Sequence, residues 1–241
     1  MTHIDAIILA GGLGTRLRPV LNDAPKALAR INDHPFLDYL LAQLSHCPGL
    51  RKVVLAVGYL SEQVVDRYMP AEKFRFSIDF SVETQLLGTA GAVKQAISRT
   101  SSSHVLVMNG DSYLDFDFDK FIKSASSRPD VGWIAVKHMD NTRRYGSVIL
   151  EKDGRISAFR EKEQSSGGGY INAGVYLLPR DIIDAIPANK AASLEKELFP
   201  TLCAEGRLYG HRSTGEFIDI GTPESYQRAT DFFKTRLLRV K

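Results

Sequence analysis

Short apolar runs alternate with segments of helical periodicity over residues 1–110. Continuously apolar runs, typical of strands covered on both faces, occupy residues 7–9, 53–57 and 105–108. Apolar positions at a helical spacing predict helices over residues 35–46, 61–68 and 88–97, and an alternating pattern predicts a strand over residues 76–82. This order of elements predicts an α/β fold with a single doubly wound, mostly parallel (Rossmann-like) sheet and helices on both faces.

From residue 131 the pattern changes to mainly strand signals. They cover residues 132–136, 147–151, 156–160 and 174–178, with a hairpin turn at Asp153-Gly154. Helices over residues 181–186 and 193–205, strands over 207–212 and 216–220, and a helix over 223–238 complete the pattern. We expect one domain over residues 1–241 that includes a smaller β-rich part.

The first predicted strand runs directly into a glycine-rich loop. Gly11, Gly12 and Gly14 carry no side chains, so backbone N–H groups there can surround an anion. Arg16 and Lys26 add positive charge, which suits a polyphosphate. The Gly-Lys-Ser/Thr of a Walker loop is missing, and a dinucleotide fingerprint fails at its third glycine. A turn with glycines for packing alone would leave both cations unexplained.

Two aspartates stand at the ends of predicted strands. Asp111 follows the apolar run at residues 105–108, where open α/β sheets bind ligands, although an aspartate there can also cap a helix. Mg²⁺ prefers one or two carboxylates together with phosphate and water oxygens, so a second acid is expected nearby. Asp219, at the end of an apolar strand, is the candidate.

Another acidic run, Asp115, Asp117 and Asp119, resembles the D-x-D motif of glycosyltransferases. Acids at the start of a helix are stabilised by the helix dipole, and Asp111 already occupies the end of the strand. We therefore expect these three acids to form a solvated helix start.

The composition of the chain bears on its binding partners and on its cellular compartment. The 241 residues are 44% hydrophobic and 24% charged, with a net charge of +3, which is too small to indicate nucleic-acid binding. Cys47 and Cys203 are far apart and lack metal-binding spacing, so a reduced compartment with two buried thiols is expected. No signal-like segment and no apolar run near 18 residues occurs. We expect a cytoplasmic protein without membrane segments.

The string GGLGTRL at residues 11–17, followed by Pro25-Lys26, resembles the signature of the sugar-1-phosphate nucleotidyltransferases. These enzymes join a nucleoside triphosphate to a sugar 1-phosphate and release pyrophosphate. Their signature usually reads Pro-Lys-Pro, whereas Ala27 follows the lysine here. The resemblance implies that the cofactor is Mg²⁺, bound by Asp111 and Asp219, and that the β-rich part forms the sugar pocket.

The resemblance also implies roles for other residues. Glu163 stands where the family usually has proline after the lysine of its sugar-phosphate element. Independently of the resemblance, the Ser/Gly composition of residues 165–169 predicts a mobile loop that is a candidate lid over the sugar. The expected catalytic residues are Arg16, Lys26, Asp111 and Lys162. The residues expected to bind the nucleotide are Leu9, Ala10, Gly11, Gly12, Gly14, Thr15, Glu83, Gln85 and Gly88. Those expected to bind the sugar phosphate are Tyr145, Gly146, Glu161, Lys162 and Asn172.

Glu83 bears on the choice of base. The pyrimidine enzymes of the family read the base with an amide a few residues before the glycine that corresponds to Gly88, where this chain has Glu83. A carboxylate can accept both N1–H and the 2-amino group of guanine, whereas uracil and thymine present one donor between two acceptors. GTP is therefore predicted, with the backbone of residues 9–11 and Gln85 completing the contact. Alternatively, Glu83 faces solvent and the main chain alone reads guanine.

Three strings, IILAGG at 7–12, LGTAGA at 87–92 and FIDIG at 217–221, are most similar to those of D-glycero-D-manno-heptose 1-phosphate guanylyltransferases. This resemblance implies synthesis of GDP-heptose for a surface polysaccharide, either capsule or lipopolysaccharide. Mannose-1-phosphate guanylyltransferase and glucose-1-phosphate thymidylyl- or uridylyltransferase remain alternatives.

Two other classes stay open. A regulatory paralogue would bind sugar nucleotide and a partner subunit without catalysis, but it is expected to lose a loop cation or a metal-binding acid. A glycosyltransferase would release nucleoside diphosphate instead of pyrophosphate. In the favoured reaction the sugar-phosphate oxygen attacks the α-phosphorus in line and no general base is needed. The sequence leaves open whether the chain forms a homo-oligomer.

Overall fold

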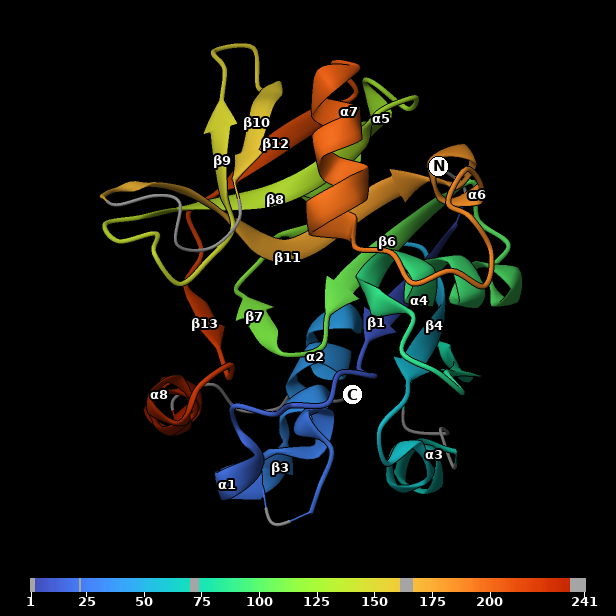
Figure 1. Cartoon of the computed structure of the whole chain (residues 1–241), viewed down its shortest axis with the longest axis vertical. Coiled ribbons are helices and arrows are strands. Elements are labelled where there is room, and N and C mark those ends of the chain that lie inside the picture. The colour runs from blue at the N-terminus through green and yellow to red at the C-terminus, as the bar shows by residue number, and fades with distance from the viewer. Residues whose placement is uncertain (1–2, 22, 70–73, 161–166, 235–241) are drawn as a thin grey trace.

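The computed structural model describes residues 3–21, 23–69, 74–160 and 167–234. Over these residues the central layer is a nine-stranded mixed sheet (Figure 1). Its strands are β1 (Ile4–Leu9), β4 (Leu50–Val57), β5 (Ser77–Val82), β6 (His104–Asn109), β8 (Gly132–Met139), β9 (Ser147–Leu150), β10 (Ile156–Arg160), β11 (Gly169–Pro179) and β12 (Leu208–Ser213). Two small sheets pair β2 (Arg30–Ile31) with β3 (His34–Pro35) and β7 (Ser112–Leu114) with β13 (Phe217–Asp219).

The sheet divides into the two parts that the sequence predicts. In the first part β1 lies between β6 and β4, β5 follows β4, and all of these pairs are parallel. In the second part β11 runs antiparallel to β6 and also pairs with β8 and β9, while β9 and β10 form the predicted hairpin. β12 adds a parallel pair at β8. The fold is the predicted α/β architecture with a β-rich extension.

Helices cover both faces of the sheet (Figure 1). They are α1 (Arg18–Leu21), α2 (Phe36–Leu44), α3 (Ser61–Tyr68), α4 (Gly88–Ala96), α5 (Phe118–Ser126), α6 (Arg180–Asp184), α7 (Phe199–Ala204) and α8 (Pro223–Lys234), with short turns η1 (Lys26–Leu28), η2 (Ile97–Arg99) and η3 (Leu194–Leu198).

Side chains of one strand enter two separate cores. Ile8 of β1 packs in a core with residues of α2, α3, α5 and α8, whereas its neighbour Ile7 belongs to a second core with residues of α4, α6 and α7. Successive side chains of a strand point to opposite faces, so an apolar run without alternation is what a strand with two covered faces needs. The prediction of helices on both faces is confirmed.

Several element boundaries differ from the prediction. The helix expected over residues 193–205 consists of η3 and α7, and Pro200, at the start of α7, has no N–H to continue a helical ladder. β11 is longer than expected, because its first half pairs with β8 and β9 and its register shifts between Asn172 and Tyr176. The last helix is described to Lys234.

The acidic run before α5 is a helix start, as predicted. Asp117 is the N-cap, and its Oδ1 accepts a hydrogen bond of 3.1 Å from the N–H of Lys120. Asp119 lies in the first turn of the same helix. Among the helices in the described ranges, none is long and apolar enough to cross a membrane.

Both cysteines are free and buried, as predicted. Burial raises the pKa of the Cys47 thiol to about 12 and that of Cys203 to about 11. Since the thiolate is the reactive form, an aromatic disulfide reagent at pH 8 should modify the native protein slowly and should modify both thiols at once after denaturation. Absorbance of the released thiolate measures this. Rapid labelling of the native protein would contradict the burial of these side chains.

Candidate active site

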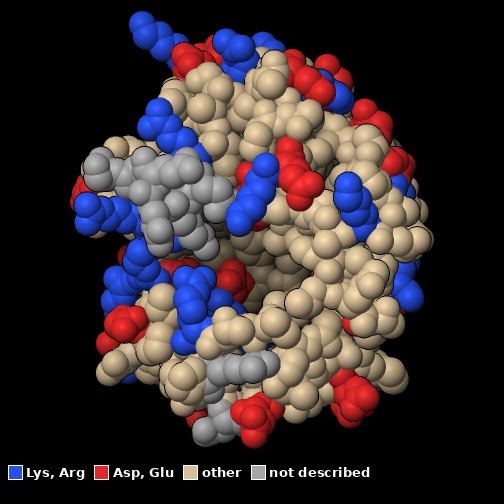
Figure 2. All heavy atoms as spheres, viewed as in Figure 1, with Lys and Arg blue, Asp and Glu red and all other residues tan. Residues whose placement is uncertain are grey.

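A cavity of about 1070 Å³ opens where β1 and β6 end, between the parallel part of the sheet and the β-rich part. Leu9 and Asn109, the last residues of those two strands, both line it. Figure 2 shows the hollow near the middle of this face, with Lys and Arg side chains gathered along one side of its mouth. Open α/β sheets bind their ligands at such strand ends.

The glycine-rich loop forms one wall. Gly11, Gly12 and Arg16 line the cavity, and Gly14 has a φ of +58° that a glycine adopts without strain. Within the described ranges, the N–H groups of residues 11–16 donate to no protein acceptor. The loop therefore presents unpaired donors and one guanidinium beside the cavity, as an anion site requires.

Glu83 follows β5 and packs against the same loop. A methyl group at Gly11 would stand 2.8 Å from Oε1 of Glu83 and 3.1 Å from the backbone nitrogen of Gly58, so any side chain at position 11 would displace the Glu83 carboxylate. Oε2 accepts a 3.0 Å hydrogen bond from the N–H of Leu87. Burial raises the pKa of the Glu83 carboxyl, and the Leu87 N–H counteracts part of that rise. Glu83 lines the cavity next to the loop and does not simply face solvent.

The remaining residues expected at the nucleotide differ in placement. Gly88 lines the cavity, Ala10 is buried with its N–H on the carbonyl of Ala56, and Thr15 is exposed. Gln85 is also exposed and lies outside the cavity lining, because the chain turns between β5 and α4 at this point. The structure does not bring Gln85 to the predicted base site.

The two aspartates converge from different strands. In the β7–β13 ladder Asp219 pairs with Ser112, the residue next to Asp111, and the N–H of Ile220 donates to the carbonyl of Asp111 over 2.9 Å. Lys26 Nζ lies 2.7 Å from Oδ2 of Asp111, so a loop cation and this acid form an ion pair. Both aspartates line the cavity.

Asp219 is held by several donors. Arg144 Nη2 lies 3.2 Å from Oδ1 and 3.3 Å from Oδ2. The Tyr145 hydroxyl donates to Oδ2 over 2.8 Å, and the N–H of Gly221 and the hydroxyl of Ser225 donate to Oδ1 over 2.7 and 3.0 Å. Burial, followed by the Asp219 charge, raises the pKa of Tyr145 to about 12. Tyr145 is therefore a donor to the carboxylate at neutral pH.

The β-rich wall carries Asn172 and Gly146. The backbone N–H of Asn172 donates to the carbonyl of Gly146 over 2.8 Å. Its side chain accepts from the N–H of Gly174 and donates to the Tyr176 hydroxyl, each over 2.9 Å. Part of its hydrogen-bonding capacity thus holds the bend of β11. Glu161, Lys162 and residues 165–166 of the expected lid lie outside the described residues.

The donor set fits a hard divalent cation only together with a phosphate. No group of three or more His, Cys, Asp or Glu side chains suited to a metal occurs in the described part of the chain. Asp111 and Asp219 supply carboxylate oxygens at one place, and Mg²⁺ usually takes one or two carboxylates plus substrate phosphates and water. Lys26 and Arg144 hold those carboxylates here, and either cation can pair with a phosphate oxygen instead.

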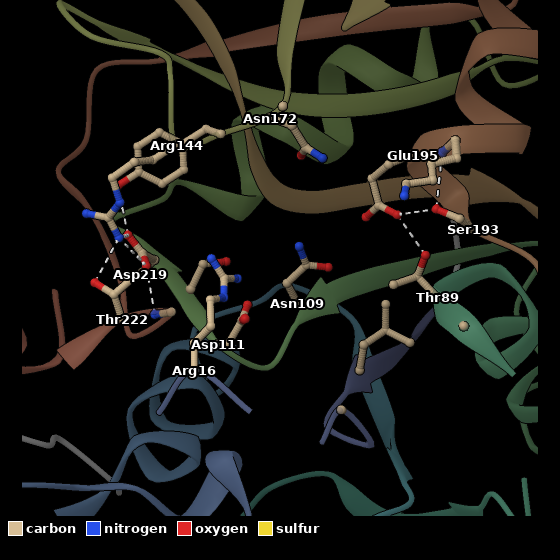
Figure 3. A pocket seen from close by; sticks show the side chains of 18 of the residues that line it. Arg16, Thr89, Asn109, Asp111, Arg144, Asn172, Ser193, Glu195, Asp219 and Thr222 are labelled. Carbon is tan, nitrogen blue, oxygen red and sulfur yellow. Dashed lines mark hydrogen bonds and ion pairs between the residues drawn. The ribbon is translucent and has the colours of Figure 1, made fainter. Parts of the chain in front are cut away.

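Figure 3 shows further cavity residues that the sequence analysis missed. Arg144 lies beside Asp219 on one side, Thr89 and Glu195 lie on the other, and Asn109 stands between them. Arg144 directly precedes Tyr145, which is the only local signal for it. Glu195 falls in a segment that the sequence pattern predicts to be an ordinary helix, so nothing local indicates that this glutamate lines the cavity. Its hydrogen-bond partner Thr89 is 106 positions away in the sequence.

Comparison with known proteins shows to which family the chain belongs. The Nucleotidyl transferase family matches residues 5–236. The D-glycero-alpha-D-manno-heptose 1-phosphate guanylyltransferase of Aneurinibacillus thermoaerophilus is 37% identical over 227 residues, which are 94% of this chain and 96% of that protein. The mannose-1-phosphate guanylyltransferase catalytic subunit beta of Drosophila melanogaster is 37% identical over 92% of this chain, but the chain spans only 60% of its length.

A solved structure agrees with these relatives. The crystal structure of HddC from Yersinia pseudotuberculosis complexed with GMP-PN has a TM-score of 0.81 at 35% identity. The match covers 95% of this chain and 99% of that chain. The resemblance inferred from the glycine-rich loop and the two aspartates is thereby confirmed, and the chain belongs to the nucleotidyl transferase family.

Proposed function

We propose that this protein transfers GMP from GTP to D-glycero-α-D-manno-heptose 1-phosphate, with release of pyrophosphate and formation of GDP-heptose. The observation that carries the proposal is one cavity that joins the glycine-rich loop and Glu83 to the paired acids Asp111 and Asp219. The near full-length relative named for this activity supports the choice of sugar. The HddC complex with GMP-PN supports the choice of base.

The base site is built around Glu83. Its carboxylate lies against Gly11 and lines the cavity, and one oxygen is already oriented by the N–H of Leu87. Guanine offers two adjacent donors that a carboxylate accepts with charge assistance. Uracil and thymine would place carbonyl lone pairs against the same oxygens. Glu83 therefore favours guanine and disfavours pyrimidines in one contact.

The glycine-rich loop and the cations beside it bind the phosphates of both substrates. Both substrates are anions, so the main barrier is repulsion during approach and charge on the phosphoryl oxygens during transfer. The N–H groups of residues 11–16, which have no acceptor among the described residues, lie in this region together with the charges of Arg16, Lys26 and Arg144. The nucleophile is already an anionic phosphate oxygen that attacks the α-phosphorus in line, so no side chain has to remove a proton.

Mg²⁺, when bound by Asp111 and Asp219, would neutralise charge on the triphosphate. The protein residues contribute position and charge. Tyr145, Gly221 and Ser225 fix the Asp219 carboxylate, and Lys26 pairs with that of Asp111 in the free site. Lys26 and Arg144 are then available to move from these acids to phosphate oxygens.

A crossed assay tests the proposed function. Pyrophosphate release should be measured with GTP, ATP, UTP and dTTP against heptose, mannose and glucose 1-phosphates. We expect the highest kcat/KM for GTP with the heptose. Release of nucleoside diphosphate instead of pyrophosphate would indicate a glycosyltransferase, and binding of GDP-sugar without turnover would indicate a regulatory paralogue. Either result would overturn the proposal.

The first prediction concerns the paired acids. Asp111→Asn and Asp219→Asn should each lower kcat by about 10²–10³-fold, because each removes a carboxylate that acts on the same charged centre. The double variant should cost little more than the worse single variant, since the two groups act as a unit. Asp119→Asn, at an exposed helix start, is the matched control and should keep full activity. Additive losses in log rate would argue against a shared ion.

The second prediction concerns Lys26. Lys26→Ala should lower kcat/KM for both substrates by about 10²-fold or more, because the lysine meets phosphate charge as it develops. Lys123→Ala removes an exposed lysine that pairs with Asp119 on α5 and serves as the control. Steady-state kinetics with each substrate varied in turn measures the effect. Near-normal activity would mean that Lys26 only neutralises Asp111.

The third prediction concerns Glu83. Glu83→Gln should lower the ratio of kcat/KM for GTP over that for UTP by about tenfold or more, the scale of a lost charge-assisted hydrogen bond. In the parent this ratio should also fall as the pH is lowered, because the raised pKa of Glu83 lets the carboxyl take up a proton. Glu62→Gln on α3 is the control. An unchanged ratio in Glu83→Gln would remove Glu83 from base selection.

A further inference from the structure

A cluster of polar side chains lines the cavity opposite Arg144 and Asp219 (Figure 3). Oε2 of Glu195 accepts hydrogen bonds from the Thr89 hydroxyl over 2.7 Å and from the Ser193 hydroxyl over 3.0 Å. Figure 3 shows the other carboxylate oxygen of Glu195 facing the cavity. Two donors therefore orient this carboxylate before any ligand arrives.

The segment that carries Glu195 is fixed to the start of α4. The N–H of Ala192 donates to the carbonyl of Leu87, and the N–H of Ala90 donates to the carbonyl of Ala192, each over 2.9 Å. The N–H of Leu194 donates to the Thr89 hydroxyl over 2.8 Å. These bonds hold Glu195 on a rigid wall, so a contact with a substrate costs little reorganisation.

Asn109 presents a second acceptor on the cavity floor. Its Oδ1 is buried and has no hydrogen-bond partner among the described residues. The hydroxyl of Ser112, three residues further along the chain, is also buried and has no hydrogen-bond partner among the described residues. Buried polar atoms normally have partners, and both residues line the cavity, so a ligand group there can complete the hydrogen bonding of this region.

The position of these acceptors limits what they can meet. The charged residues Arg16, Lys26, Asp111 and Asp219 gather at the loop and at the β7–β13 ladder. In the proposed function the triphosphate reacts there, so the phosphate of the sugar 1-phosphate has to approach this side of the cavity. Glu195 lies across the cavity from Asp219 (Figure 3). A pyranose held by its C1 phosphate turns its C4 hydroxyl and its exocyclic carbon chain away from that phosphate.

We infer that Asn109 and Glu195 form the site that reads the sugar hydroxyls most distant from the C1 phosphate, at C4 and on the exocyclic chain. This inference rests on the proposed function. Both groups offer hydrogen-bond acceptors, so they pair with hydroxyl donors and disfavour a sugar that lacks them, because such a sugar would cover the acceptors without pairing with them. Two acceptors in the same cavity favour a sugar whose exocyclic chain carries more than one hydroxyl.

The test uses four 1-phosphates at saturating GTP: those of D-glycero-D-manno-heptose, mannose, 4-deoxymannose and 6-deoxymannose. In the parent, loss of the hydroxyl that is read should lower kcat/KM by about tenfold or more relative to mannose. Asn109→Leu and Glu195→Gln should bring that ratio towards one by raising KM for the complete sugars. The KM for GTP and the melting temperature should stay close to those of the parent.

Glu197→Gln is the matched control. Glu197 belongs to the same η3 turn and accepts the N–H of Ser193, but it lines a different pocket. It should leave every sugar ratio unchanged. Parent-like ratios in both Asn109→Leu and Glu195→Gln, or equal turnover of all four sugars by the parent, would overturn the inference while the proposed function stands. Absence of GTP-dependent pyrophosphate release by the parent would overturn both.

Discussion

The site depends on one constraint, which is that two negatively charged carboxylates, those of Asp111 and Asp219, lie at the β7–β13 ladder. Asp219 stands opposite Ser112, the residue next to Asp111, and both aspartates line the cavity. Like charges held in one cavity repel each other more strongly than they would in bulk water. Lys26 pairs with Asp111 and Arg144 pairs with Asp219, which relieves this repulsion. Substrate phosphates can use the same cations, so the charge balance of the free site and its chemistry are coupled.

The two ends of the cavity are also connected mechanically. Glu83 holds the N–H of Leu87, and the carbonyl of Leu87 holds the N–H of Ala192, three residues before Glu195. Two hydrogen bonds through Leu87 therefore connect Glu83 to the backbone segment that carries Glu195. These bonds tie two parts of the cavity wall to each other, and in the proposed function the phosphates react in the cavity that they enclose. Such preorganisation is the main contribution that a protein makes to phosphoryl transfer between two anions.

Much of the fold and part of the site could be predicted because their signals are local. The apolar run at residues 53–57 identifies a strand buried on both faces, and Gly11 and Asp111 directly follow such strands. Glu195 and Asn109 could not be found in this way. The role of Glu195 depends on Thr89, which is 106 positions distant, and that of Asn109 depends on an oxygen that only the folded chain buries. The sequence also predicts too short a strand for β11, because the first half of this strand forms only through pairing with β8 and β9.

The central claim is that Asp111 and Asp219 act together on the triphosphate while Lys26 moves from an acid to a phosphate. A crystal structure with a non-hydrolysable GTP analogue and Mn²⁺, whose anomalous scattering locates the ion, tests this directly, because carboxylate and phosphate oxygens suit Mn²⁺ as they suit Mg²⁺. We predict one peak between the two aspartates and the phosphates, with Lys26 Nζ on a phosphate oxygen and guanine against Glu83. A peak away from Asp219, with Lys26 still bonded to Asp111, would contradict the account.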